Sequence, residues 1–251
     1  MANDTQRDIN KLDATDISLT SSNPFLKWIE NFWYYHKWKV IIIAFFAIVL
    51  TVGIVQMVNK EDPDSEITLA THTIFYKENV DGIEQALVSL MPSDRNGDGT
   101  KKIQLQFYKI YSPEEMNAAN EAETDEDGKP VIYVDKSYND SQYSDYRDYI
   151  NTGESSILIV SEYLYSELVA QERVRPLSEV FGDNLPQGTM SDGYGVRLTD
   201  TGVYEFFDAF KTLPDDTVIC LLRSYVWGAS SKESHYAYAE EYFKNIVTFG
   251  E

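Results

Sequence analysis

The sequence has one cysteine and a small share of basic residues. A single cysteine, Cys220, excludes an intramolecular disulfide, a cysteine-rich metal cluster and a CxxC redox motif. Its apolar neighbours predict a buried core residue rather than a reactive thiol. There are 21 Lys and Arg residues against 41 Asp and Glu, which gives a net charge of −20. The basic footprint of a nucleic-acid-binding protein is missing, and we expect no nucleic-acid partner.

Sequence motifs for catalysis are also missing. The chain has no GxSxG, no HExxH and no phosphate-cradling glycine loop. His72 and His235 follow the long apolar segment described next, and neither belongs to a recognisable catalytic motif. We therefore expect no enzyme and no cofactor. A hydrolase with a histidine base is kept as a remote alternative, because catalytic residues need not be adjacent in sequence.

One long run of apolar residues is present. Residues Val40–Val58 (VIIIAFFAIVLTVGIVQMV) contain no charge. As a helix this run is about 28 Å long, close to the ~30 Å hydrocarbon core of a bilayer. No small-residue cleavage site follows it, which favours an uncleaved signal anchor over a signal peptide. Aromatic residues precede the run as an interfacial belt would: Trp33, Tyr34, Tyr35 and Trp38.

Charge on either side of this run predicts its orientation. Lys27, Lys37 and Lys39 precede it, whereas Lys60 is followed by several acidic residues. Residues 1–60 carry 6 basic and 5 acidic groups, and the rest of the chain carries 15 and 36. By the positive-inside rule, we expect a single-pass protein of the cell membrane with a cytoplasmic N-terminus and an extracytoplasmic C-terminal domain.

Composition divides the chain into five segments. Residues 1–22 are polar and predict a disordered cytoplasmic tail. Residues 23–39 predict an amphipathic helix on the inner leaflet, or alternatively an N-terminal extension of the membrane helix. Residues 40–58 would contact the lipid bilayer, residues 59–65 form a polar linker, and residues 66–251 form one α/β domain.

Strand and helix signals alternate through residues 66–251. This alternation predicts an α/β domain whose mixed or mostly parallel sheet is covered by helices. We expect Ile157, Leu158, Ile159, Ile219 and Leu221 to be buried. The predicted strands are Ile67–Tyr76, Ile103–Tyr111, Ser156–Ser161, Gly195–Leu198 and Thr217–Tyr225. The predicted helices are Val80–Met91, one starting at Ser112-Pro113, Tyr143–Ile150, Glu162–Val174, Val203–Phe210 and Ser234–Phe249.

The segment Tyr143–Gly182 resembles a stretch of bacterial extracellular solute-binding proteins. It shares a helix that ends at a glycine-containing turn, a short apolar strand (SILIVS), a further helix and a Pro-Leu element. The sequence YGVRL at Tyr194–Leu198 is similar to the strand by which that family enters its second lobe. Members of the family have two lobes and longer chains. The resemblance therefore implies a reduced, membrane-anchored relative with one lobe.

A ligand site follows from this resemblance. In open α/β sheets, ligands bind beyond the carboxyl ends of the strands. A single lobe covers one side of a solute, so we expect weak binding of a small molecule, on the order of 0.1–1 mM or ~4–5.5 kcal/mol. The candidate ligand-binding residues are Tyr76, Ser161, Glu162, Tyr163, Tyr225 and Trp227.

Two other patterns have competing interpretations. Asp94, Asn96 and Asp98 match the opening of a calcium loop, but Leu105 stands where the bidentate glutamate belongs. A polar turn with glycines at positive φ is the preferred interpretation, and calcium is the alternative. A group of nearby tyrosines could form a platform for sugars or peptides: Tyr133, Tyr138, Tyr143, Tyr146 and Tyr149. The last three are spaced to share one face of a helix, so packing on the sheet is preferred.

Two functions are consistent with these patterns. The first is a non-catalytic ligand- or protein-binding module held at the membrane. The second is a structural or scaffolding subunit of a cell-envelope complex, with a membrane or envelope protein as its partner. A concave polar and aromatic groove would favour the first, and a flat apolar patch would favour the second.

Overall fold

The computed structural model describes residues 24–58, 63–121, 133–223 and 230–250. By contacts, the chain divides into two compact units, Met1–Glu61 and Asp62–Glu251. Each unit is described by itself.

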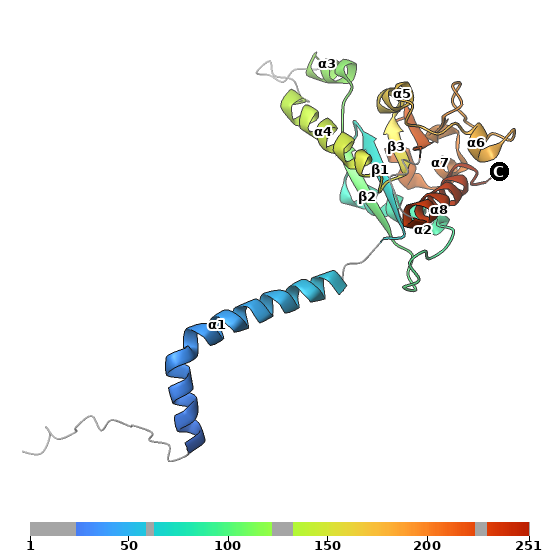
Figure 1. The fold of residues 1–251 in the computed structure, drawn as a ribbon. Coiled ribbons are helices and arrows are strands. Elements are labelled where there is room, and N and C mark those ends of the chain that lie inside the picture. The colour runs from blue at the N-terminus through green and yellow to red at the C-terminus, as the bar shows by residue number, and fades with distance from the viewer. Residues whose placement is uncertain (1–23, 59–62, 122–132, 224–229, 251) are drawn as a thin grey trace, which may run out of the picture. The chain divides into compact units, whose positions relative to one another are not determined.

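The first unit contains one long helix. Helix α1 spans Pro24–Val58, and Figure 1 shows that it bends part-way along its length. Its window Lys27–Val55 is apolar and is not buried by any residue that the structure describes. The helix is long and apolar enough to cross a membrane, although a signal sequence has the same properties. The aromatic stretch before Val40 is continuous with the apolar helix, and the rings of Trp28 and Phe32 stack at 5.5 Å along it.

The second unit is built on a mixed five-stranded sheet with strand order β2-β1-β3-β5-β4. Strands β1, β2 and β3 are parallel, and β5 is antiparallel to both β3 and β4. The α/β class and the single sheet are thus as predicted. The bounds of the strands are β1 Ser65–Thr71, β2 Ile103–Lys109, β3 Ile157–Ser161, β4 Gly195–Arg197 and β5 Thr217–Leu221.

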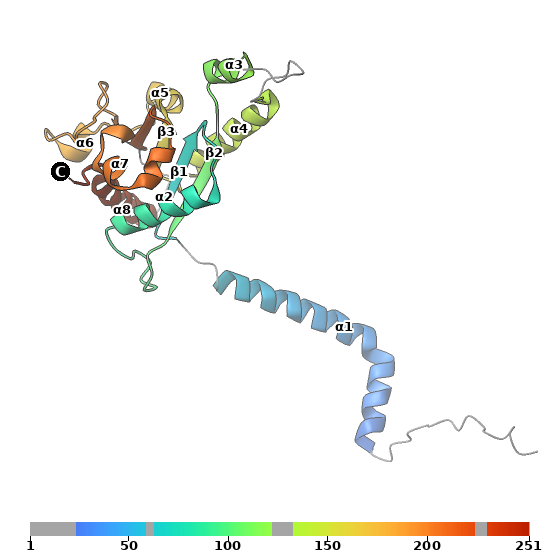
Figure 2. The same ribbon diagram turned by 180° about the vertical axis from the view of Figure 1, so that it is seen from behind.

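Helices flank the sheet on both faces (Figures 1 and 2). The helices of this unit are α2 Lys77–Leu90, α3 Pro113–Glu121, α4 Lys136–Thr152, α5 Glu162–Ala170, α6 Ser178–Phe181, α7 Gly202–Phe206 and α8 Ser230–Val247, and α3 contributes no residue to either core. Two 3₁₀ helices, η1 Leu198–Asp200 and η2 Asp208–Thr212, lie on either side of α7 between β4 and β5. Apolar residues on both sides of the central strands explain this layering, because an interior strand must be covered twice.

Strand β3 shows how the two cores arise. Ile157 and Ile159 belong to the core beneath α2 and α8, whereas Leu158 and Val160 belong to the core beneath α4 and α5. This division follows from the two-residue period of a strand. Ser156–Ser161 is interior, as predicted, because β3 lies between β1 and β5. The five side chains predicted to be buried, Ile157, Leu158, Ile159, Ile219 and Leu221, are all fully buried.

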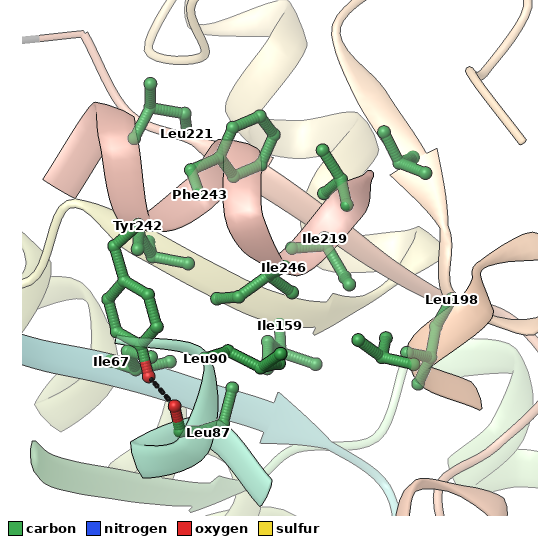
Figure 3. Close-up of a cluster of buried hydrophobic side chains, with 14 of the residues drawn as sticks. Ile67, Leu87, Leu90, Ile159, Leu198, Ile219, Leu221, Tyr242, Phe243 and Ile246 are labelled. Carbon is green, nitrogen blue, oxygen red and sulfur yellow. Dashed lines mark hydrogen bonds between the residues drawn. The ribbon is translucent and has the colours of Figure 1, made fainter. Parts of the chain in front are cut away.

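The core beneath α8 is the larger of the two (Figure 3). Phe243 and Ile246 of α8 belong to the same cluster of buried side chains as Ile219 of β5 (Figure 3). Tyr242 reaches across to α2, where its hydroxyl donates a hydrogen bond of 2.7 Å to the carbonyl of Leu87. This core therefore joins the last helix of the chain to the first helix of the domain.

Several predicted boundaries differ from the structure. The linker was expected to reach residue 65, yet Asp64 and Ser65 are buried in the domain. The Asp64 carboxylate accepts hydrogen bonds from the backbone N–H groups of Arg95, Asn96 and Lys102, which ties it to the loop before β2. The linker assignment for 59–62 lies outside the described residues, as does the tail 1–22.

Several elements end before their predicted last residues, among them β1, β2, β5, α5 and α7. Strand β1 ends at Thr71 instead of Tyr76, since its pairing with β2 ends at that residue. Helix α5 ends at Ala170 because Glu172 adopts a positive φ of 56°.

Cys220 is fully buried, as predicted. Tyr146 is buried, and Tyr108 packs against the rings of Tyr146 and Tyr149, which supports the packing interpretation of these tyrosines.

Candidate functional site

The candidate site lies at the carboxyl edge of the parallel strands. The chain leaves β1 through α2 to reach β2, and it leaves β3 in the opposite direction, toward β5 and β4. This reversal makes the edge between β1 and β3 a topological switch point, where open α/β sheets bind their ligands. Because β5 is antiparallel, its first residue, Thr217, pairs with Ser161 at this same edge.

Three polar side chains from distant parts of the sequence meet at this edge. Each of His72, Glu115 and Asp216 offers one ligand atom, and these atoms lie within 4.8 Å of one another. All three residues are half-buried. The residues come from the segment after β1, from α3 and from the loop before β5. A nitrogen and two carboxylate oxygens held together in this way can bind a cation or a polar ligand.

His72 directly follows the last residue of β1. Its Nδ1 atom lies 2.8 Å from Oε1 of Glu115. Nδ1 is buried, and despite this short distance it has no hydrogen-bond partner among the described residues. We infer that the carboxylate oxygen lies off the direction in which this ring nitrogen would form a hydrogen bond. The imidazole also packs beside Tyr111, with ring centroids 5.9 Å apart.

Glu115 is fixed by a capping box at the start of α3. The N–H of Ser112 donates to Oε2 of Glu115 at 2.7 Å, and the N–H of Glu115 donates to Oγ of Ser112 at 3.1 Å. Such reciprocal bonds satisfy two backbone groups that would otherwise lack partners. One carboxylate oxygen is therefore held by the helix terminus, and the other faces His72.

Asp216 precedes β5 in a tight turn. The N–H and the hydroxyl of Thr217 both donate to the carbonyl of Pro214, at 3.0 and 2.6 Å. The carboxylate of Asp216 makes no hydrogen bond or ion pair with any residue that the structure describes. It is therefore a half-buried acceptor that is available to a ligand.

Four of the predicted binding residues belong to the described chain. Tyr76 is exposed and precedes α2, and Ser161 is fully buried at the end of β3. The Ser161 hydroxyl has no hydrogen-bond partner among the described residues. Glu162 pairs with Arg197 at 2.8 Å. Tyr163 donates to Glu167 at 3.2 Å, and partial burial together with the Glu167 carboxylate raises the pKa of Tyr163 to about 12.

The two other predicted residues, Tyr225 and Trp227, lie outside the described residues. They were grouped with the site because a parallel β5 would end at the ligand-binding edge. Strand β5 runs the other way, since its last residue, Leu221, pairs with Ile157 at the amino end of β3. The loop before β5 takes their place at the edge and contributes Asp216.

Sequence reasoning missed all three members of the cluster as site residues. His72 was placed inside a strand, whereas it is the first residue beyond β1. The Ser112-x-x-Glu115 spacing is a capping-box signature, and it could have identified Glu115 as a side chain held at a helix terminus. Asp216 had no comparable signal, because its position depends on the direction of β5.

The possible calcium loop is held together by its own side chains. The carboxylate of Asp94 accepts two glycine N–H groups at 2.7 Å, and Oδ1 of Asn96 accepts the N–H of Asp98 at 2.8 Å. Both glycines have positive φ, as the turn interpretation predicted. Hydrogen bonds from the side chain and backbone of Thr100 lower the pKa of Asp98. Calcium binding at Asp94, Asn96 and Asp98 stays a prediction.

Comparisons with known proteins gave no match to a family model, to a curated protein or to a solved structure. The functional argument therefore rests on the residues and geometry of this chain.

Proposed function

We propose that this protein is a membrane-anchored module that binds a small polar solute outside the cytoplasm. The supporting observation is the convergence of His72, Glu115 and Asp216 at the carboxyl edge between β1 and β3. Polar side chains with available acceptors, at the place where the sheet topology favours ligands, suit recognition of hydroxyl or amine groups. No covalent chemistry is required of them.

Aromatic and apolar groups near this edge suit the same role. Ile74 and Tyr76 are exposed in the segment that follows His72, and Tyr111 packs beside the His72 ring. Small-molecule sites usually combine such surfaces with a few polar groups that fix orientation. The solute-binding resemblance of Tyr143–Gly182 supports this class of ligand, and a single lobe keeps the expected affinity in the range of 0.1–1 mM.

Scaffolding is the second candidate. Two exposed apolar side chains away from the candidate site, Phe206 of α7 and Leu185 of the loop after α6, are separate from each other in the sequence. Single exposed apolar residues are normal on soluble domains, so this distribution favours the solute-binding role. Under both proposals α1 anchors the chain, with its basic N-terminal flank in the cytoplasm.

Thermal unfolding of the full-length protein in detergent tests solute binding. With a dissociation constant of 0.1–1 mM, a matching sugar or short peptide at about 10 mM should add about 1.4–2.7 kcal/mol of stability. That gain raises the melting temperature by roughly 3–10 °C. Asp216→Asn should abolish the shift, whereas the adjacent, exposed Asp215→Asn should keep it.

The same experiment separates the two candidates. If no member of a broad panel of sugars and peptides stabilises the protein, and a membrane protein co-purifies with it in stoichiometric amounts, the solute-binding role is wrong. If both aspartate variants keep the rise in melting temperature, the solute binds elsewhere than at this edge of the sheet.

A further inference from the structure

We propose that His72, Glu115 and Asp216 bind one divalent transition-metal ion of the zinc type. The three residues supply one imidazole nitrogen and two carboxylate oxygens. Zinc accepts this donor set, and sites with three protein ligands keep a fourth position open for water or another molecule. The proposal concerns the ion and is independent of solute binding.

The distances within the cluster are close to those that an ion needs. Zinc lies 2.0–2.2 Å from nitrogen and oxygen ligands, so ligand atoms in a tetrahedral site are about 3.4 Å apart. The donor atoms here lie within 4.8 Å of one another, and the Nδ1–Oε1 distance from His72 to Glu115 is 2.8 Å. Small rotations of the side chains therefore complete the site. Asp216 has the freedom for this movement because its carboxylate has no partner among the described residues.

A second observation points to a ligand at this place. Nδ1 of His72 is buried and has no hydrogen-bond partner among the described residues. A buried nitrogen without a hydrogen-bond partner is costly, and coordination to an ion would remove that cost. The capping box supports the same geometry, because it holds Oε2 of Glu115 and leaves Oε1 directed at the cluster. Metal-bound carboxylates are commonly oriented by such outer hydrogen bonds.

Charge favours a cation at this cluster. The two carboxylates carry two negative charges, which one divalent ion neutralises. The whole chain has a net charge of −20, so cations are attracted to its surface in general. Calcium fits less well, because it requires six to eight oxygen ligands and rarely takes nitrogen. The imidazole is therefore the feature that selects a transition metal.

The open coordination position gives the ion a role in the proposed function. Oxygen atoms of a carboxylate- or hydroxyl-bearing solute could occupy it and gain a directed bond that a single lobe otherwise lacks. This second step rests on the proposed solute binding, whereas the metal site itself does not.

Isothermal titration of the full-length protein with ZnCl₂ tests the site. The protein is purified in detergent without a polyhistidine tag and stripped with a chelator. We expect one high-affinity zinc per chain. His72→Ala and Asp216→Asn should each weaken zinc binding at least tenfold, since each removes one of three ligands.

Two matched controls accompany these variants. Asp215→Asn removes the neighbouring carboxylate, and His235→Ala removes the other histidine of the domain. His235 contacts Arg95, which is hydrogen-bonded to Asp64 at the opposite end of β1 from His72. Both controls should bind zinc as the wild type does. Circular dichroism verifies that each variant is folded, and X-ray absorption of the zinc complex should show one imidazole ligand at about 2.0–2.1 Å.

The outcomes distinguish the ion from the solute. Zinc affinity that is unchanged in folded His72→Ala and Asp216→Asn, or the absence of stoichiometric binding, would overturn the metal site and would show that Glu115 serves His72 only as an ion-pair partner. Zinc binding that depends on both residues, without stabilisation by any solute, would support the metal site and count against the proposed solute binding. Solute binding that persists after a chelator has removed the ion would show that the ion does not take part in solute recognition.

Discussion

One buried and one half-buried tyrosine of α8 place their hydroxyl groups against backbone carbonyls. Tyr238 donates to the carbonyl of Ser93 at 2.6 Å, and Tyr236 donates to that of Leu222 at 2.8 Å. Burial, together with the nearby Asp64 carboxylate, raises the pKa of Tyr238 to about 12. The neutral phenol is therefore favoured in the folded state, and stability becomes sensitive to alkaline pH.

Tyr238→Phe tests this coupling. Below pH 10, the substitution should cost about 1 kcal/mol, because it removes the hydrogen bond to Ser93. Between pH 10 and about 12, unfolded tyrosine loses its proton while folded Tyr238 keeps it, so the wild type loses stability that the variant cannot lose. At pH 11 this loss is about 1.4 kcal/mol, so the difference in stability between the two proteins should close. Thermal unfolding of both proteins at pH 8 and at pH 11 measures this difference in stability.

Tyr138→Phe is the matched control, since Tyr138 is exposed. It should leave stability unchanged at both pH values. A gap for Tyr238→Phe that stays constant from pH 8 to pH 11 would show that this hydroxyl does not couple folding to alkaline pH.

The role of a single residue can be predicted from the sequence when its neighbours in the sequence determine that role. The buried role of Cys220 and the positive φ of the two loop glycines follow from their neighbours in the sequence, and both were predicted correctly. The cluster of His72, Glu115 and Asp216 could not be predicted in this way. Its members are brought together by strand order and by the direction of β5, which no local pattern determines.

At the scale of helices and strands, the end of α2 is stabilised by side chains of α8. The final carbonyls of a helix lack partners within the helix. At the end of α2, Tyr242 donates to the carbonyl of Leu87 at 2.7 Å, and Asn245 donates to that of Leu90 at 3.1 Å (Figure 3 shows the first of these). Side chains near the end of the chain therefore cap a helix near the start of the domain.

Tyr242→Phe should weaken this connection. Tyr242 is fully buried, so the substitution keeps the ring but leaves the carbonyl of Leu87 without the donated hydrogen bond. We expect a loss of about 1–3 kcal/mol and a melting temperature lower by roughly 2–12 °C. Tyr133→Phe, at an exposed position, should unfold as the wild type does. A Tyr242→Phe protein with an unchanged melting temperature would indicate that another group or water replaces the hydroxyl.

Element types were more predictable than their bounds. The predicted strands Ser156–Ser161 and Thr217–Tyr225 were recognised because their apolar runs suit interior strands. The structure has strands there as β3 Ile157–Ser161 and β5 Thr217–Leu221. Helix α4 begins at Lys136, earlier than the predicted Tyr143, because Asp135 caps it by accepting the N–H of Tyr138. Strand β1 ends at the last residue that pairs with β2, and a short stretch of sequence does not contain the information about this pairing.

For the whole molecule, the division of charge suggests how the chain is oriented. The unit Met1–Glu61 contains the helix that could span a membrane, and nearly all the negative charge follows it. Lysines before the apolar run favour a cytoplasmic N-terminus. The proposed function therefore predicts that Asp62–Glu251 faces the other side of the membrane.

Labelling of engineered cysteines in intact cells tests this orientation. The native Cys220 is fully buried, and burial raises the pKa of its thiol, so it should contribute little background. Ser178→Cys, at an exposed position of α6, should react with a membrane-impermeant maleimide in intact cells. Ser18→Cys, before the apolar helix, should react only after the membrane is permeabilised. The unmodified chain reports the background. Labelling of Ser18→Cys from outside, with protection of Ser178→Cys, would reverse the proposed topology, and equal labelling of both in intact cells would exclude a spanning α1.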